Sequence, residues 1–403
     1  MDKKTINFVG LGYVGLPAAL LLQNSGYPII GTDINQELIS ELSNRKKTFD
    51  EPGLQEAYDQ AMVNGIQFTT KYQQAEIYVV AVPTPFEATT KKIDPTYLVN
   101  ALTAINEHCL EGAVIIVEST ISPGTIDQYV RPIFKNKKVS LCHAPERILP
   151  GNILKELRYN SRTIGADNEE TAQVVKEIYQ GFCEGEIVLT DIKTAELSKV
   201  VENTFRDINI AFANELKLIC EREGLDVHSV IEIANKHPRV NILNPGTGVG
   251  GHCIPVDPWF LVGDYPEQAR LIRTAREVND AVPKRILDKV REVMDHSFSG
   301  KRLGIYGLTY KDNVDDVRES PSLQLYQAMT DKEQAEVLFY DPLVKKSIVK
   351  NQAMDFDDFL QNTDVVLVMN RHEHLLVNEP LIQQSSETVL DPIGDLSMDK
   401  VVL

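Results

Sequence analysis

The stretch INFVGLGYVG, residues 6–15, joins a short apolar strand to a glycine-rich turn of the form GxGxxG, and LPAALLLQNSG continues as a helix. In such a unit the first glycine permits the tight turn, and the second lets a pyrophosphate approach the backbone. The third allows the helix to pack closely on the sheet, and the helix N-terminus favours negative charge. Gly10, Gly12 and Gly15 therefore predict a dinucleotide-binding turn, with Tyr13 and Val14 beside the cofactor.

Asp33 indicates which dinucleotide this turn favours. It ends the next apolar run, PIIGTD at residues 28–33, at the separation from the glycines where an acid binds ribose hydroxyls. A carboxylate there repels a 2′-phosphate, so the sequence predicts NAD rather than NADP.

Strand-like and helix-length segments alternate through the first half of the chain. This alternation predicts an α/β fold with a parallel sheet wrapped by helices. Together with the glycine turn, it predicts an N-terminal Rossmann domain of residues 1–192. The expected strands are residues 6–9, 29–32, 77–82, 114–118 and 139–143.

Long helical periodicity replaces this alternation from about residue 193 to residue 294. Residues 195–220 contain no Gly or Pro, and their apolar side chains recur at spacings of three and four, which predicts one long, core-forming helix. These side chains are Leu197, Val200, Val201, Phe205, Ile208, Phe212 and Leu216.

A second strand and helix alternation begins at residue 301. Strands are expected at residues 301–308, 335–340 and 365–369, with a helix at 322–329. The chain is therefore predicted to continue after its first domain with a central long-helix domain, residues 193–298, and a smaller Rossmann-like domain, residues 299–403.

The composition is that of an ordinary globular protein, with 43% hydrophobic and 25% charged residues among 403. A net charge of −17 without a long basic run argues against nucleic acid as a partner. Five widely spaced cysteines form no CxxC pair or zinc pattern, so neither disulfides nor a metal site is expected. No segment resembles a signal peptide or a membrane span, which predicts a cytoplasmic protein without membrane contact.

Six motifs across nearly the whole chain resemble those of the UDP-glucose/GDP-mannose dehydrogenase family, and they run in the family's order. The resemblance implies NAD-dependent oxidation of a UDP-sugar. The motifs are VPTP (82–85), ESTISPGT (118–125), APERILPG (144–151), AELSKVVENTFRDINIAFANEL (195–216), GTGVGGHCIPVDPWF (246–260) and GLTYKDNVDDVRESPS (307–322).

Two longer stretches, PERILPG and HPRVNI, are similar to the branch of that family that oxidises the 6-hydroxyl of UDP-N-acetylmannosamine to the uronate. UDP-N-acetylglucosamine is the alternative, followed by UDP-glucose. A single hydroxyl-sized contact separates the two N-acetylated epimers, so the sequence leaves the choice between them open.

Cys253 is the cysteine whose surroundings suit covalent chemistry. Oxidation of a primary alcohol to an acid takes two hydride transfers, and a thiol can hold the intermediate aldehyde as a thiohemiacetal. Cys253 lies in the glycine loop GVGGHC, where a substrate could approach closely, and Asp257 could orient a water or the thiol proton. The usual alternative is a buried, inert cysteine. That alternative is accepted for Cys109, Cys142, Cys183 and Cys220.

Lys199, Asn203 and Arg206 follow at spacings of four and three, so they share one face of the long helix. The resemblance implies that Lys199 is a general acid/base and that Asn203 is its partner on the alkoxide or thiohemiacetal oxygen. A cation and an amide directed at a developing oxyanion suit this chemistry. The alternative is a solvated face with salt bridges to Glu196 and Glu202.

The resemblance also implies contacts to the cofactor and the sugar nucleotide. Thr120 corresponds to the threonine that holds the catalytic water beside the nicotinamide, although STISPG is also a plain turn sequence. Thr84, Thr120 and Arg318 are implied NAD contacts. Arginine forks suit phosphate, but a structural ion pair is equally open for the arginines. The implied substrate contacts are Arg147, Ile148, Lys199, Asn203, Arg206, His237, Arg239, Gly250, Tyr310 and Lys311.

Two positions depart from the family pattern. Pro150 stands where the glucose-type enzymes carry a second glutamate, so the role of that glutamate is not transferred. Ile393 stands near the place where many relatives carry a basic residue for the substrate, which leaves the last substrate contact unassigned.

Two other functions compete with this reading. A β-hydroxyacid or 6-phosphogluconate dehydrogenase also has a Rossmann domain followed by a helical one, but that chemistry needs no thiol. A catalytically silent NAD-binding regulator would not need Cys253, Lys199, Asn203 and Asp257 together. The long helix resembles the segment through which the family dimerises, which implies a homodimer.

Overall fold

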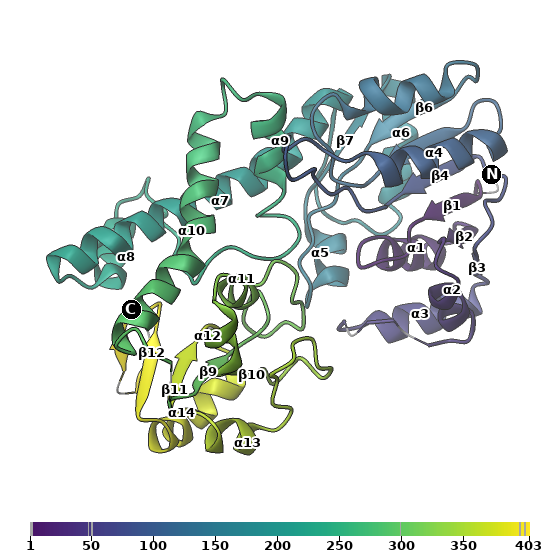
Figure 1. The fold of residues 1–403 in the computed structure, drawn as a ribbon. Helices are drawn as coiled ribbons and strands as arrows, with labels where there is room; N and C mark the ends of the chain where they lie inside the picture. The colour runs from purple at the N-terminus through teal and green to yellow at the C-terminus, as the bar shows by residue number, and fades with distance from the viewer. Residues whose placement is uncertain (1–2, 47, 50, 299, 395, 399) are drawn as a thin grey trace. The chain divides into compact units, whose positions relative to one another are not determined.

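The computed structural model describes residues 3–46, 48–49, 51–298, 300–394, 396–398 and 400–403. The chain divides into two compact units, Met1–Glu202 and Asn203–Leu403, and the division falls inside one long helix. Each unit contains its own sheet with helices around it (Figure 1). The predicted α/β class is confirmed, whereas the division at residues 192 and 298 stays a prediction.

An eight-stranded sheet forms the first unit, in the order β3-β2-β1-β4-β5-β6-β7-β8. In this order, β2 and β3 lie on one side of β1, and β4 and the later strands lie on the other side. This is the doubly wound arrangement expected after a dinucleotide-binding turn. The strands are β1 (Ile6–Val9), β2 (Ile29–Thr32), β3 (Gln67–Thr69), β4 (Ile77–Val80), β5 (Val114–Val117), β6 (Ser140–His143), β7 (Arg162–Ala166) and β8 (Ile187–Thr190).

The five strands predicted in this half are confirmed, but β3, β7 and β8 were not predicted. The predicted strands pair in the parallel sense, as expected, and the antiparallel pair in this sheet is formed by β6 with the unpredicted β7. Strand β7 begins with a charged residue, Arg162, so its first position does not look like part of an apolar strand. Arg162 is only 4% exposed there, and it is neutralised by Glu118 at 2.9 Å.

The helices of the first unit bury mainly apolar faces on this sheet. Helix α1 is buried from Gly15 to Gln23, which explains its nearly unbroken apolar sequence. The helices are α1 (Gly15–Asn24), α2 (Gln36–Ser43), α3 (Leu54–Val63), α4 (Thr96–His108), the π-helix η1 (Ile126–Val130), the 3-10 helix η2 (Arg131–Phe134), α5 (Ile153–Tyr159) and α6 (Glu169–Tyr179).

The second unit joins a helical part to a parallel five-stranded sheet of order β10-β9-β11-β12-β13. Its helices and strands are the C-terminal part of α7 (Ile192–Glu223), α8 (Val227–Asn235), α9 (Asp257–Asp264), α10 (Arg270–Val293), β9 (Leu303–Tyr306), α11 (Pro321–Gln327), α12 (Asp331–Ala335), β10 (Val337–Tyr340), α13 (Phe356–Gln361), β11 (Val365–Val368), α14 (Glu373–Ser385), β12 (Thr388–Asp391) and β13 (Val401–Val402).

The prediction that α7 is core-forming is wrong for much of its apolar stripe. The helix itself is confirmed, but Phe205 is 65% exposed, whereas Lys199 and Asn203 are 7% and 8% exposed. Periodicity predicts which side chains share a face, but it does not decide which face is buried. The other exposed members of the stripe are Leu197, Val201 and Phe212.

The second unit contains its own glycine turn, directly after β9. Gly307 has a φ of +99°, and the next backbone N–H, that of Leu308, donates to Asp341 Oδ2 at 2.7 Å. Asp341 follows β10 and is only 4% exposed. Its carboxylate also accepts hydrogen bonds from the Leu343 backbone N–H at 2.8 Å and from His372 Nε2 at 3.2 Å.

Candidate active site

The glycine turn after β1 has the geometry that a dinucleotide pyrophosphate needs. Gly10 has a φ of +92°, and a Cβ there would lie 2.3 Å from the Ala81 carbonyl oxygen. A Cβ on Gly15 would lie 1.9 Å from the Gly10 carbonyl oxygen, so the start of α1 requires glycine. A Cβ on Gly12 would meet nothing within 4 Å, so the space beside it is open to a ligand. The residues present fit NAD.

Asp33 lies beside this turn, at the C-terminal end of β2. Its Oδ2 accepts the Leu11 backbone N–H at 2.9 Å, and its Oδ1 accepts that of Asn35 at 2.9 Å. The two bonds hold the half-buried carboxylate at the turn, where it could accept ribose hydroxyls. Tyr13 lies on the exposed side of the turn and packs on Phe49, with ring centroids 4.3 Å apart.

Replacing Asp33 with alanine is expected to weaken NAD binding about tenfold or more and to improve relative use of NADP. The change removes a ribose acceptor and the charge that repels a 2′-phosphate. Titration of both cofactors by calorimetry measures the effect.

The matched control is Asp33→Asn, which keeps a carbonyl for the Leu11 N–H but removes the charge. It should retain more NAD affinity than the alanine variant while gaining NADP use. Unchanged NAD affinity in both variants would rule out Asp33 as the ribose ligand.

The loops after β4 and β5 are joined by hydroxyl groups. The Thr84 hydroxyl donates to the Thr120 carbonyl at 2.6 Å, and the Ser119 hydroxyl accepts the Val82 backbone N–H at 2.9 Å. Both loops follow the C-terminal ends of their strands, as the glycine turn follows that of β1. The structure thus places the predicted residues Thr84 and Thr120 together on the ligand-binding edge of the sheet.

Lys199 lies on the buried side of α7, with two ionisable side chains of the first unit in its electrostatic surroundings. These are Glu146 and His143, and the Lys199 cation acts on the pKa of both. Burial lowers the pKa of His143 to about 3, so His143 is neutral at physiological pH. A solvated lysine, the alternative for this position, is excluded by its 7% exposure.

Glu146 is a candidate that the sequence reasoning missed, although it lies inside the quoted motif APERILPG. Burial raises its pKa, although the cations of Lys199 and Arg162 act in the opposite direction. Its Oε2 has no hydrogen-bond partner among the residues that the structure describes. A buried carboxyl with a raised pKa beside a lysine is typical of a proton-transfer site. The sequence did offer one indication of this role, because Glu146 is an ionisable residue inside a motif that the family resemblance had already singled out.

The two glutamates next to Lys199 on α7 each fix a loop. Glu196 is fully buried and accepts the Gly124 and Ile126 backbone N–H groups at 2.5 and 2.9 Å, so it anchors the loop after Thr120. Glu202 forms a bidentate ion pair with Arg147, whose Nε lies 2.7 and 2.8 Å from its two oxygens.

Arg147 is fully engaged within the protein. Besides Glu202, its guanidinium donates to the Ser161 carbonyl at 2.6 Å and to the Thr163 hydroxyl at 3.0 Å. Its side chain therefore forms the structural ion pair that the sequence left open. A substrate contact by Arg147 stays a prediction, and it would require these bonds to exchange. Ile148 packs partly buried on the core of the first unit.

Cys253 is exposed, whereas Cys109, Cys142, Cys183 and Cys220 are buried. The Cys253 carbonyl accepts the Asp257 backbone N–H at 2.9 Å, so the two residues lie one helical turn apart. Asn203 Nδ2 donates to Asp257 Oδ2 at 2.6 Å, and both residues are buried. The second unit therefore brings together an accessible thiol, a buried carboxylate and the amide that orients it.

The glycine loop before Cys253 packs against its own chain. A Cβ on Gly250 would lie 2.4 Å from the Glu319 carbonyl oxygen, and one on Gly251 would lie 3.0 Å from the Tyr310 ring. The Gly251 backbone N–H also donates to the Arg318 carbonyl at 2.9 Å. The loop packs closely on the segment after β9, and this packing requires glycine at both positions. The sequence alone had indicated a different reason for these glycines, the close approach of a substrate.

Five further predicted contacts are exposed side chains of the second unit. Arg318 forms an ion pair with Asp316 at 2.6 Å, and the Arg239 backbone N–H donates to His237 Nδ1 at 3.3 Å. Their roles toward NAD or substrate stay predictions. The five are Arg206, His237, Arg239, Lys311 and Arg318.

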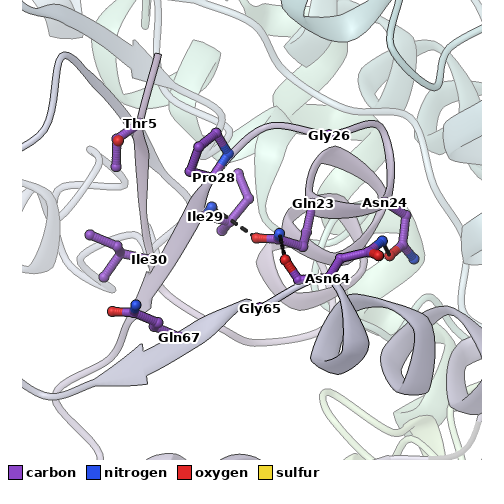
Figure 2. A pocket seen from close by; sticks show the side chains of 10 residues that line it. All are labelled: Thr5, Gln23, Asn24, Gly26, Pro28, Ile29, Ile30, Asn64, Gly65 and Gln67. Atoms are coloured by element: carbon purple, nitrogen blue, oxygen red, sulfur yellow. Dashed lines mark hydrogen bonds between the residues drawn. The ribbon is translucent and has the colours of Figure 1, made fainter. Parts of the chain in front are cut away.

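The first unit contains a hollow of about 590 Å³ (Figure 2). It is lined near the N-terminal ends of β1 and β2, whereas Gly10 and Asp33 follow their C-terminal ends. The Gln23 amide in its lining forms hydrogen bonds within the protein. Gln23 Nε2 donates to the Asn64 carbonyl at 2.7 Å, and Gln23 Oε1 accepts the Ile29 backbone N–H at 2.9 Å. We therefore interpret the hollow as a gap in the packing between the ends of α1, α3 and β2, not as a ligand site.

Two further features, a metal site and a membrane span, are absent from the part of the chain that the structure describes. No group of three or more His, Cys, Asp or Glu side chains there is arranged to hold a metal ion. No helix among the same residues is long and apolar enough to span a membrane.

Comparison with known proteins places this geometry among sugar-nucleotide dehydrogenases. The chain is 43% identical to a UDP-N-acetyl-D-mannosamine dehydrogenase of Methanocaldococcus jannaschii, over 92% of this chain and 86% of the relative. It is 39% identical to an NDP-N-acetyl-D-galactosaminuronic acid dehydrogenase of Ralstonia solanacearum, over 93% and 92%. A solved UDP-N-acetyl-mannosamine dehydrogenase of S. aureus superposes with a TM-score of 0.89 at 38% identity, over 99% and 97%.

Three family models match in succession along the chain. They are described as the NAD binding domain, the central domain and the UDP binding domain of the UDP-glucose/GDP-mannose dehydrogenase family, at residues 4–183, 193–281 and 304–391. The chain belongs to the UDP-glucose/GDP-mannose dehydrogenase family and is an NAD-dependent UDP-sugar dehydrogenase.

Proposed function

We propose that the protein oxidises the 6-hydroxyl of UDP-N-acetyl-D-mannosamine to the carboxylate through a thioester on Cys253. The observation that carries this proposal is the accessible Cys253 thiol, one helical turn before Asp257, whose carboxylate Asn203 orients at 2.6 Å. Similarity to UDP-N-acetyl-D-mannosamine dehydrogenases, together with PERILPG and HPRVNI, supports the choice of sugar.

Bound NAD supplies the hydride acceptor for both oxidations. In the first, the substrate hydroxyl loses its proton, and the Lys199 cation and the Asn203 amide stabilise the alkoxide that develops. Glu146, with its raised pKa and unpartnered oxygen, is the group beside Lys199 that takes up the proton. The product of this step is an aldehyde at carbon six.

The second oxidation needs the thiol. Cys253 Sγ adds to the aldehyde carbon, and the resulting thiohemiacetal loses a hydride to become a thioester. Water held at Thr120 then cleaves the carbon–sulfur bond, which releases the carboxylate and restores the thiol. Asp257, one helical turn after Cys253, orients the thiol proton or this water. The sum is one sugar, two NAD and one water giving one acid, two NADH and two protons.

The purified protein is expected to oxidise UDP-N-acetylmannosamine at least about tenfold more efficiently than UDP-glucose. A site shaped for an N-acetyl group binds the transition state less tightly when the substrate lacks that group. The measurement is NADH formation with UDP-N-acetylmannosamine, UDP-N-acetylglucosamine, UDP-N-acetylgalactosamine, UDP-glucose and GDP-mannose, counting NADH per acid. A preference for UDP-glucose would refute the choice of sugar, and a preference for another N-acetylated sugar would reassign it.

A homodimer through α7 is part of the same proposal. The exposed stripe on α7 is contiguous along one helix face, and exposed apolar patches of this kind mark interaction sites. Sedimentation equilibrium is expected to give twice the mass of 45.2 kDa, and Phe205→Asp to shift the protein toward the monomer. The cytoplasmic location predicted from the sequence also belongs to this proposal, and cell fractionation checks it.

A further inference from the structure

Two asparagines of α7 hold the segment that carries Cys253, one on each side of the thiol. Asn203 Nδ2 binds Asp257 Oδ2 at 2.6 Å, and Asn214 Oδ1 accepts the Gly246 backbone N–H at 3.0 Å. Asn203 is 8% exposed and Asn214 is 4% exposed. The Asn203 bond is buried and the Asn214 bond is partly buried, so losing either leaves a largely buried polar group without that hydrogen bond.

Asn214 is itself oriented by a buried chain of hydrogen bonds between α7 and α10. Its Nδ2 donates to Asn279 Oδ1 at 2.9 Å, and Asn279 Nδ2 donates to Asp207 Oδ1 at 2.8 Å. Arg276 also donates to Asp207 Oδ1, at 2.5 Å. Asn279 and Asp207 are 0% exposed, and Arg276 is 1% exposed.

The Asp207 carboxylate fixes which group donates and which accepts in each of these hydrogen bonds. A carboxylate accepts and does not donate, so Asn279 must turn its NH₂ toward Asp207 and its carbonyl toward Asn214. Asn214 must then turn its NH₂ toward Asn279, which leaves its carbonyl for Gly246. The Asp207 and Arg276 pair thus specifies, through two amides, the orientation of the group that anchors the glycine loop.

We propose that Asn214 and Asn279 are positioning residues for the Cys253 thiol, so that their loss impairs the thiol-dependent second oxidation selectively. This inference rests on the proposed function of Cys253. The Gly246 anchor lies seven residues before Cys253, and the loop between them has glycine at 248, 250 and 251. Such a loop has little stiffness of its own, so its position depends on the anchors at its ends.

Asn214→Ala is expected to lower acid formation by about 10-fold to 100-fold, the range for a misplaced reacting group. The KM for the sugar nucleotide and the dissociation constant for NAD should stay within about twofold, because the expected displacement is confined to the segment that carries the thiol. Hydrogen exchange measured by mass spectrometry should show earlier deuteration of the 246–257 segment.

A double-mutant cycle separates positioning from a merely structural role. In the Cys253→Ala background the thiol is already absent, so adding Asn214→Ala should leave single-turnover NADH from the first oxidation unchanged. A further fall in that first oxidation, or near wild-type acid formation by Asn214→Ala alone, would overturn the proposal. If Cys253→Ala itself still makes acid, the proposed function fails, and hydrogen exchange separately records whether Asn214 anchors the loop.

Asn235→Ala is the matched control. The Asn235 amide binds both the N–H and the carbonyl of Ile242, at 2.7 and 2.9 Å, so it anchors the same segment farther from the thiol. It should lower the melting temperature without lowering the rate of the second oxidation. Asn279→Ala is the milder test should Asn214→Ala fold poorly. It keeps Asn214 Oδ1 as the acceptor for the Gly246 N–H, and it removes the Asn279 carbonyl that orients Asn214 together with the Asn279 donor to Asp207.

Discussion

Cys253→Ala is expected to lower formation of the sugar acid by about a thousandfold or more, while the first oxidation of the alcohol continues. The variant removes the only exposed thiol among the cysteines, so the aldehyde has no sulfur nucleophile to capture it. Single-turnover experiments should therefore give one NADH per sugar, where the wild-type protein gives two. Mass spectrometry after acid quench should find a sugar adduct on the wild-type protein and none on the variant.

Cys109→Ala is the control for the loss of a thiol as such. Cys109 is buried, and burial raises the pKa of its thiol, so it is a poor nucleophile. That variant should keep two NADH per sugar. Acid formation by Cys253→Ala at near the wild-type rate would show that the aldehyde hydrate is oxidised directly and that the thioester mechanism is wrong.

Lys199→Ala is expected to slow the first oxidation about a hundredfold or more, because the alkoxide loses its electrostatic stabilisation and its route for the proton. The two variants should therefore fail differently: Cys253→Ala keeps the first NADH and Lys199→Ala loses it. Burial already raises the pKa of Glu146, and removing the nearby Lys199 cation raises it further. Stopped-flow measurement of the first NADH checks the prediction.

Lys193 offers a matched control on the same helix. It is 65% exposed and pairs with Asp127 at 3.4 Å, so Lys193→Ala removes a cation from α7 without touching the buried face. The first oxidation should then proceed at the wild-type rate. A wild-type first oxidation in Lys199→Ala would exclude Lys199 from the chemistry and leave Glu146 as the candidate proton acceptor.

The sequence predicted best where backbone geometry restricts the residue. Gly10 and Gly15 have no room for a Cβ, so their positions in the chain reveal the turn, and Asp33 follows after one helix and one strand. The accessible Cys253 was also distinguished correctly from the other cysteines, because a glycine loop is a poor place to bury a side chain.

Pairing between distant residues is what the sequence could not reveal. Arg147 and Glu202 are 55 positions apart, and only the fold makes them an ion pair. The same applies to Asn214 and Asn279, which are 65 positions apart and read in sequence as ordinary polar residues of amphipathic helices. The buried face of α7 was assigned wrongly for a related reason. Its polar residues have buried partners, and its apolar residues face outward.

The glycine turn after β9 bears on how many cofactor molecules each chain holds. At the first turn, the half-buried Asp33 uses its two oxygens on the Leu11 and Asn35 amides and still borders open space beside Gly12. At the second, Asp341 is enclosed by backbone amides and His372, which leaves no lone pair directed at a ribose. The second turn thus keeps the backbone form of a dinucleotide site without its recognition group, and we expect titration to give a stoichiometry of one NAD per chain.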